Sequence, residues 1–210
     1  PDLIVLAAQQ LTTAASLQSA AAAFLEHRLP LAYGGLIFNR IPELRSRIPA
    51  HFLGERLEES AATIEKLALH PAPFPEAALD ESGRALAQLY QEKRPLIELG
   101  INQRFQKEAP LTEYLADVNG YLGGELVAAL ELGNLAFVEP DLEWIRQFLS
   151  VSTNMKEDLF SYLTAYREMI LKELGPAGAP MADWITDYLN RHETTSAGPG
   201  KESEVPHAGS

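Results

Sequence analysis

Two adjacent glycines are the residues best suited to bringing the backbone close to a ligand. Gly34 and Gly35 lie between apolar runs in the segment 29–54, LPLAYGGLIFNRIPELRSRIPAHFLG. Glycine has no Cβ, so a flat or bulky ligand can approach its backbone closely. Ligands of parallel α/β sheets bind just beyond the carboxyl ends of the strands, where a glycine pair after a short apolar run would lie. The alternative is a tight turn that requires a positive φ, and on local grounds the pair favours that turn.

A second set of glycines interrupts a strongly helical segment at 113–134. Each of Gly120, Gly123 and Gly124 costs a helix about 1 kcal/mol relative to alanine. Such glycines usually allow close helix packing, which is the favoured interpretation here. The other interpretation is a cavity for a flat cofactor, because small residues leave room for a ring system. The aromatic residues that could line such a cavity are Tyr114, Tyr121, Phe137, Trp144 and Phe148.

Metal-ligating and catalytic patterns are weak. No two of the five histidines have ligand spacing on one face, so none is a strong metal candidate. Neighbouring carboxylates such as Glu157 and Asp158 are best interpreted as a solvated helix face. The sequence contains no nucleophile elbow, no glycine-rich phosphate-binding loop and no acid/base pair in a glycine-framed loop. We therefore predict no catalytic residues and no enzyme activity.

Composition and charge exclude several classes of protein. With 210 residues and 46% hydrophobic content, the chain can form one or two domains. It has no cysteine, which excludes disulfides and thiol nucleophiles and fits a reducing compartment. No apolar run approaches the ~18 residues that cross a bilayer, so we predict a soluble, cytoplasmic protein with no membrane contact. Residues 71–193 hold 10 Lys and Arg against 20 Asp and Glu, and this acidity disfavours direct nucleic-acid binding.

Residues 1–69 alternate between strand-like and helical patterns. Strand-like runs are expected at 3–8, 31–38 and 51–54, and helices at 12–28, 42–47 and 55–69. This order is typical of a parallel sheet with crossover helices, and the continuous apolar run LIVLAA suits a strand covered on both faces. We predict about half of a Rossmann-like α/β domain. Because the chain begins at Pro1, just ahead of that run, we expect the other half in sequence upstream.

The pattern changes near residue 70. Residues 70–83 are rich in proline and are predicted to be a linker. Helical periodicity dominates residues 84–192, which predicts an acidic all-α bundle of about five or six helices. The polar, Gly/Ser/Pro-rich residues 193–210 are predicted to be a disordered tail.

The first 68 residues resemble the C-terminal half of a cobalamin-binding domain. AYGG, then a Phe, then PEL and LG followed by a final helix occur in the order found in MerR-type regulators that respond to cobalamin or light. The resemblance implies that cobalamin is bound, with its dimethylbenzimidazole tail in a slot lined by Gly34 and Gly35 and flanked by Tyr33 and Leu36. The family's histidine that ligates cobalt from below belongs to a DxHxxG motif, which would lie upstream of residue 1.

One contact of the family is altered in this chain. The family places a Ser or Thr after the preceding strand, where it hydrogen-bonds the tail, and the nearest position here is Ala7. Gln9, Gln10 and Thr12 are the substitutes for that polar contact. The cofactor-binding residues that the resemblance implies are therefore Ala7, Gln9, Thr12, Tyr33, Gly34, Gly35 and Leu36.

The helical part resembles the extension that follows the cobalamin domain in some members, including photoreceptors in which a bilin binds beside cobalamin. Without cysteine, a thioether-linked bilin is excluded within these residues, whereas a noncovalent bilin is not. The favoured hypothesis is a cobalamin-binding sensor whose helices relay the cofactor or light state to a regulatory partner, to an upstream DNA-binding domain or within a homo-oligomer. The alternatives are a corrinoid-carrying subunit of a methyltransferase or mutase system and a helical interaction module on an α/β unit that binds nothing.

Overall fold

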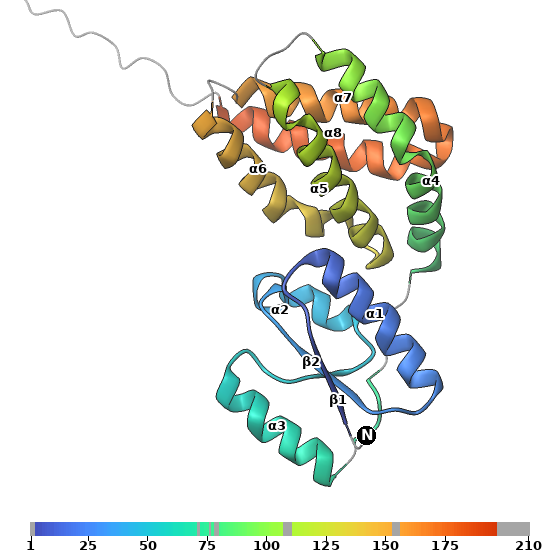
Figure 1. The fold of residues 1–210 in the computed structure, drawn as a ribbon, viewed down its shortest axis with the longest axis vertical. Helices are drawn as coiled ribbons and strands as arrows, with labels where there is room; N and C mark the ends of the chain where they lie inside the picture. The colour runs from blue at the N-terminus through green and yellow to red at the C-terminus, as the bar shows by residue number, and fades with distance from the viewer. Residues whose placement is uncertain are drawn as a thin grey trace, which may run out of the picture.

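The computed structural model describes residues 3–70, 72–75, 77, 80–106, 111–152 and 156–196. A small α/β unit is followed by a larger set of helices that pack against one end of it (Figure 1). The chain is therefore mostly helical with one parallel sheet, as the sequence predicts at this coarse level.

The sheet contains three parallel strands in the order β1-β2-β3. Strand β1 pairs with β2 in a register that sets Ala7 opposite Gly34, and β2 pairs in turn with β3. Parallel neighbours require a crossover, which the helices between them provide. The elements of this unit are β1 (Ile4–Ala7), α1 (Leu11–Glu26), β2 (Leu31–Gly34), α2 (Ile37–Arg40), η1 (Pro42–Arg47), β3 (His51–Phe52) and α3 (Leu57–Leu69).

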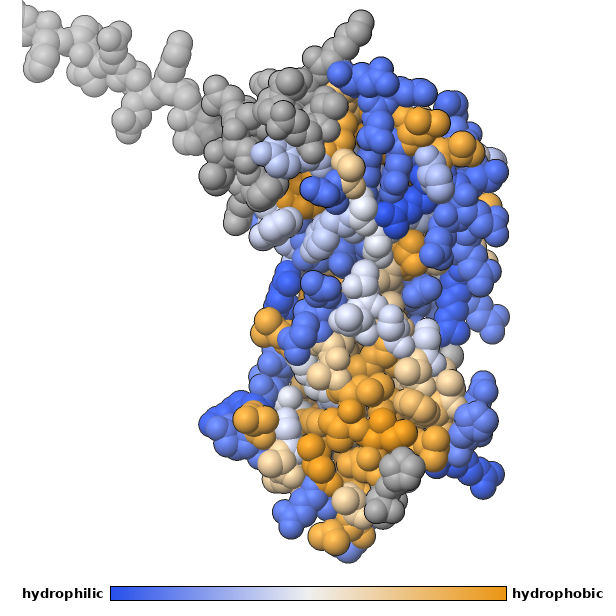
Figure 2. Space-filling view, in the orientation of Figure 1, coloured by the Kyte–Doolittle hydropathy of each residue, from blue (hydrophilic) through white to orange (hydrophobic). Residues whose placement is uncertain are grey.

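The two faces of the sheet are covered unequally. Tyr33 points from β2 into the main core, which also contains the buried side of α1. On the opposite face, Ala32 packs with Leu53 and with Leu67 of α3. Beside α3 that face is left bare at β1, where Val5 is 45% exposed, and Figure 2 shows apolar side chains gathered over β1 and β2.

The helical part packs its longest helices side by side. α4 packs against α5 and α7, and α7 packs against α8. In their core, the Tyr162 hydroxyl donates to Asn119 Oδ1 at 2.7 Å, and the hydroxyls of Tyr90 and Tyr166 hydrogen-bond each other. The elements of this part are α4 (Glu81–Phe105), α5 (Leu111–Glu131), η2 (Leu135–Val138), α6 (Glu139–Ser152), α7 (Lys156–Leu174), η3 (Gly175–Gly178) and α8 (Ala179–Ser196).

Helix α1 joins the two parts through one continuous apolar core. It packs against α5, where Thr12 Cγ2 lies 3.7 Å from the position that a Cβ on Gly124 would occupy. The buried Gln18 of α1 donates to the Arg47 carbonyl at 2.9 Å and accepts from Arg84 of α4 at 3.3 Å. The α/β unit and the helices therefore share buried apolar and polar contacts.

Three expected boundaries differ from the structure by more than two residues. β2 ends at Gly34 rather than at residue 38, because Gly35 adopts a φ of +124° and turns the chain into α2. α4 begins at Glu81, inside the predicted linker 70–83, because Asp80 caps it by accepting from the amides of Ser82 and Gly83. α8 continues to Ser196, into the predicted tail 193–210, and the rest of that tail lies outside the described residues.

Among the described residues, no helix combines the length and apolar character that crossing a bilayer requires.

The adjacent glycines Gly34 and Gly35 should respond oppositely to alanine. A Cβ on Gly35 would lie 2.0 Å from the Ala8 carbonyl oxygen at a φ that disfavours side chains, whereas a Cβ on Gly34 meets nothing within 4 Å. We expect Gly35→Ala to lower the free energy of unfolding by about 2–4 kcal/mol. Gly34→Ala should raise it by about 0.5 kcal/mol, because glycine weakens a strand. Urea unfolding measures both values, and equal effects would contradict this account.

Candidate functional site

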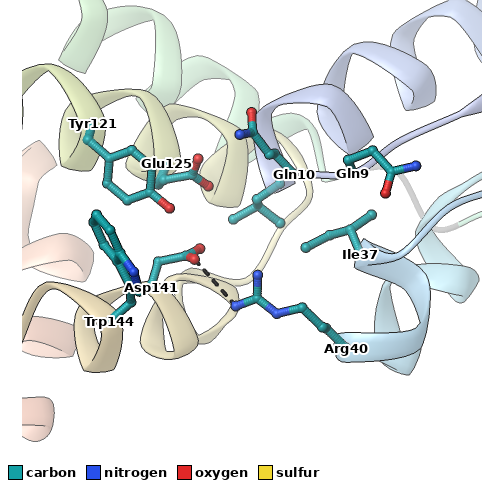
Figure 3. A pocket seen from close by; sticks show the side chains of 9 residues that line it. Gln9, Gln10, Ile37, Arg40, Tyr121, Glu125, Asp141 and Trp144 are labelled. Atoms are coloured by element: carbon teal, nitrogen blue, oxygen red, sulfur yellow. Dashed lines mark hydrogen bonds and ion pairs between the residues drawn. The ribbon is translucent and has the colours of Figure 1, made fainter. Parts of the chain in front are cut away.

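A cavity of about 590 Å³ lies at the carboxyl ends of β1 and β2, where the α/β unit meets the helices. Gln9 and Gln10 follow β1, α2 contributes Ile37 and Arg40, and α5 and α6 close the far side (Figure 3). This is the edge of a parallel sheet at which ligands commonly bind. The lining residues are Gln9, Gln10, Leu11, Ile37, Arg40, Tyr121, Glu125, Asp141 and Trp144.

An ion pair crosses this cavity between the two parts of the protein. Arg40 Nη2 of α2 lies 3.4 Å from Asp141 Oδ1 of α6, and Asp141 is 6% exposed. Tyr121 of α5 lines the cavity beside this ion pair (Figure 3). Burial, followed by the charges of Asp141 and Glu125, raises the pKa of Tyr121 well above its usual range. Tyr121 therefore keeps its proton.

Glu125 lines this cavity with a buried oxygen that has no hydrogen-bond partner. It is 3% exposed, and its Oε2 has no hydrogen-bond partner. Burial first, and the nearby charge of Asp141 second, raise its pKa from 4.5 to about 7, although Arg40 opposes the shift. A buried polar atom without a partner costs about 1–3 kcal/mol, so a ligand that supplied a donor would recover that free energy.

Two of the residues implied by the cobalamin resemblance lie together on the bare face of the sheet. Ala7 and Gly34 are register partners, and Ala7 is exposed. No atom lies within 4 Å of the position that a Cβ on Gly34 would take, so this part of the strand is open to a ligand.

Tyr33 and Gly35 have structural roles. Tyr33 is 1% exposed on the other face, and its hydroxyl donates to the Arg45 carbonyl at 3.1 Å. Burial raises the pKa of Tyr33 to about 12. Gly35 allows the chain to turn against Ala8, whose amide donates to the Gly34 carbonyl at 3.0 Å. The turn therefore accounts for Gly35, whereas Gly34 is left as the open position of the pair.

Gln9, Gln10 and Thr12, predicted to replace the family's polar contact to the cobalamin tail, lie in two different environments. Gln9 and Gln10 line the cavity, and Gln9 Oε1 accepts from the amide of Leu36 at 3.3 Å. Leu36 is 57% exposed beyond β2. Thr12 instead faces Gly124 of α5, so its side chain belongs to the packing between the two parts.

Three of the five aromatic residues expected to line a cofactor cavity lie together in the structure. Tyr114, Tyr121 and Trp144 line a largely apolar groove of about 350 Å³ between α5 and α6, and the rings of Tyr121 and Trp144 have centroids 5.8 Å apart. Phe137 is buried in η2, and the side chain of Phe148 lies outside the described residues.

Close packing explains why a glycine occupies position 123 of α5. A Cβ there would collide with the guanidinium of Arg94, which donates to the carbonyls of Asn119 and Gly120. The favoured interpretation of close packing therefore holds at Gly123, although the neighbour is an arginine of α4 rather than an apolar surface.

Sequence reasoning missed the charged residues of the cavity. Arg40, Glu125 and Asp141 come from three elements distant in sequence, so no local motif connects them. One signal was present, because Glu125 is a lone carboxylate in the apolar helical run ELVAAL. A charged residue on a buried helix face requires a partner or a shifted pKa.

Comparisons with known proteins identify no relative of this chain among protein families or curated proteins. No protein-family model matches the chain, and no curated protein is significantly similar to it. Within the described residues, no group of three or more His, Cys, Asp or Glu side chains is placed to hold a metal ion.

Removing the charge of Glu125 should stabilise the protein at high pH relative to low pH. The folded pKa of about 7 lies above the ordinary 4.5, so the folded state binds more protons and stability falls as pH rises from 4.5 through 7. The full effect is about 3 kcal/mol. Glu125→Gln lacks the titrating group. We expect its free energy of unfolding, relative to that of the unchanged protein, to be about 3 kcal/mol higher at pH 8 than at pH 4. Urea unfolding across this range measures the difference, and a constant difference would contradict the expectation.

Proposed function

We propose that this chain binds cobalamin at the bare face and carboxyl edge of its sheet and that its helices relay the state of the cofactor to a regulatory partner. The observation that carries this proposal is the open space at Gly34 beside the exposed Ala7. These are the positions at which the resemblance places the tail of cobalamin. The α/β unit corresponds, in this proposal, to part of a Rossmann-like cofactor domain.

The chemistry of the sheet face suits the flat, apolar end of the cofactor tail. Val5 and Leu36 are exposed, and Ala7 and Gly34 add little side-chain bulk. A planar aromatic group can lie against such a surface and gain about 25 cal/mol for each Å² of apolar area removed from water. Ala7 cannot donate a hydrogen bond from its side chain, so binding here would depend on apolar contact.

The carboxyl edge of the sheet suits the polar rim of a corrin ring. Gln9 and Gln10 lie at this edge, and side-chain amides both donate to and accept from the amide groups that surround the corrin. Cobalt is held by the four corrin nitrogens, so the cofactor requires no cluster of protein ligands comparable to a structural metal site. When bound, cobalamin supplies a coloured, light-sensitive centre whose upper ligand can change.

The helices are positioned to detect a ligand at this edge. Gln10 is the N-cap of α1, which packs against α5, and Arg40 of the α/β unit is paired with Asp141 of α6. A ligand that moved either the start of α1 or this ion pair would change contacts on both parts of the protein. A binding and relay role therefore fits better than catalysis, and the lack of cysteine is compatible with the reducing cytoplasm.

A noncovalent bilin is a second candidate ligand, favoured by the groove between α5 and α6. Tyr114, Tyr121 and Trp144 provide aromatic surfaces, and Val118 and Ile145 provide an apolar wall. Flat conjugated pigments bind in grooves of this composition. Such a pigment would touch α6, whose first turn contributes Asp141 to the larger cavity.

Blocking the open space at Gly34 should remove cobalamin binding without unfolding the protein. We expect the unchanged chain to retain cobalamin after desalting, as seen in its visible absorption spectrum. Gly34→Leu should weaken binding at least tenfold, because the added side chain enters the space proposed for the tail. Gly120→Leu is the matched control, since a Cβ there also meets nothing within 4 Å but lies on α5. A colourless unchanged protein, or equal binding by Gly34→Leu, would refute the proposal.

Restoring a hydroxyl at Ala7 should strengthen the same interaction. Ala7→Ser would offer the hydrogen bond that the family's Ser or Thr makes to the tail, and one such bond contributes about 0.5–1.5 kcal/mol. We expect cobalamin affinity to rise by about threefold to tenfold, measured by titration of the absorption spectrum. Ser16 lies on an exposed turn of α1, so Ser16→Ala serves as a control that changes a hydroxyl elsewhere. Unchanged affinity of Ala7→Ser would place the tail away from this strand.

A further inference from the structure

We propose that the cavity between α2, α5 and α6 binds a small organic ammonium ion whose N–H groups are accepted by Glu125 and Asp141. This inference rests on the cavity and its side chains, and it does not require that cobalamin binds to the sheet.

Glu125 offers this cavity a hydrogen-bond acceptor without a partner. Its Oε2 lacks a hydrogen-bond partner although the residue is 3% exposed, and its side chain lines the cavity (Figure 3). Buried polar atoms in proteins are nearly always hydrogen-bonded, so an exception that faces a cavity points to a donor from outside the chain. An ammonium group carries several N–H donors and no acceptor, which matches a carboxylate.

The side chains that line the cavity carry more negative than positive charge. Glu125 and Asp141 contribute two carboxylates, and Arg40 contributes one positive charge, leaving the lining with an excess negative charge when both acids are ionised. Gln9 and Gln10 are neutral. A monovalent cation would balance the remaining charge, whereas an anion would meet two carboxylates.

The lining of the cavity suits an organic ammonium better than a metal ion. Within the described residues, no metal-binding group of three acidic or histidine side chains is present, and Arg40 occupies one side of Asp141. The rings of Tyr121 and Trp144 stand beside the carboxylates (Figure 3). Leu11 and Ile37 line the cavity from the α/β unit. Aromatic faces attract organic cations, and the apolar residues can contact the carbon part of the ligand.

Protonation of Glu125 would regulate this site. The groups around it that carry or exchange charge are Asp141 on α6, Arg40 on α2 and Tyr121 on its own helix, while the start of α1 supplies only amides. The pKa of Glu125 is raised to about 7, so the carboxylate form that an ammonium requires increases from pH 6 to pH 8. Ionisation of one group across this range changes affinity by about tenfold.

The test is calorimetric titration of the whole chain, without cobalamin, with 2-phenylethylamine at pH 6 and pH 8. The neutral analogue 2-phenylethanol is titrated under the same conditions. We expect the amine to bind, with an affinity about tenfold higher at pH 8 than at pH 6, and the alcohol to bind at least tenfold more weakly. Absence of amine binding, equal binding of the alcohol, or an affinity that falls with pH would each overturn the proposal.

Two variants assign the binding to the cavity. Glu125→Gln keeps an acceptor oxygen but loses the charge, so it should bind the amine at least tenfold more weakly at pH 8 and show little dependence on pH. Glu92→Gln makes the same change of net charge at an exposed position of α4 and should bind like the unchanged protein. Similar behaviour of both variants would mean that the amine responds to overall charge and not to this site. Because no cobalamin is present, the outcome is independent of the cofactor proposal.

Discussion

The packing of α1 between the sheet and α5 is the contact on which the rest of the structure depends. Its buried positions include several alanines, and small side chains allow close approach of neighbouring elements. The same helix buries Gln18, which hydrogen-bonds to η1 on one side and to α4 on the other. A polar group buried with both its donor and its acceptor satisfied favours one arrangement of the two parts. The cavity exists because this contact brings α5 and α6 over the carboxyl ends of the strands.

Much of the α/β unit could be predicted from the sequence, because alternating apolar runs and helical patterns are local signals. The run LIVLAA and the helix after it lie where the pattern indicates. The end of β2 could not be placed, since residues 35–38 are as apolar as the strand itself. Only the positive φ of Gly35, which depends on the nearby backbone of Ala8, separates the strand from α2.

The residues of the candidate site could be predicted only in part, because the site also depends on contacts between segments distant in the sequence. Gln9 follows β1, whose end lies within one residue of the predicted one, whereas Gly34 ends β2, which the pattern extended too far. Glu125 and Asp141 lie on two helices, and their relation to Arg40 depends on how those helices dock onto the α/β unit. Docking is decided by packing between distant segments, which hydrophobic periodicity does not specify. The two neighbouring glycines illustrate the limit, because one is required by the backbone and the other leaves space open.

The bare face of β1 has a consequence for how ligand binding and assembly are linked. In the described part of the chain, β1 is an edge strand with one neighbour, and the exposed Val5 and Ala7 lie on its uncovered side. Any protein segment that covered this face would compete with a tail lying against Gly34 or would seal the tail in place. Thermodynamic reciprocity makes the two effects equal. If association changes the affinity for the cofactor by some factor, binding of the cofactor changes the association constant by the same factor. A single apolar surface could thus couple the occupancy of the sheet to the oligomeric state of the protein.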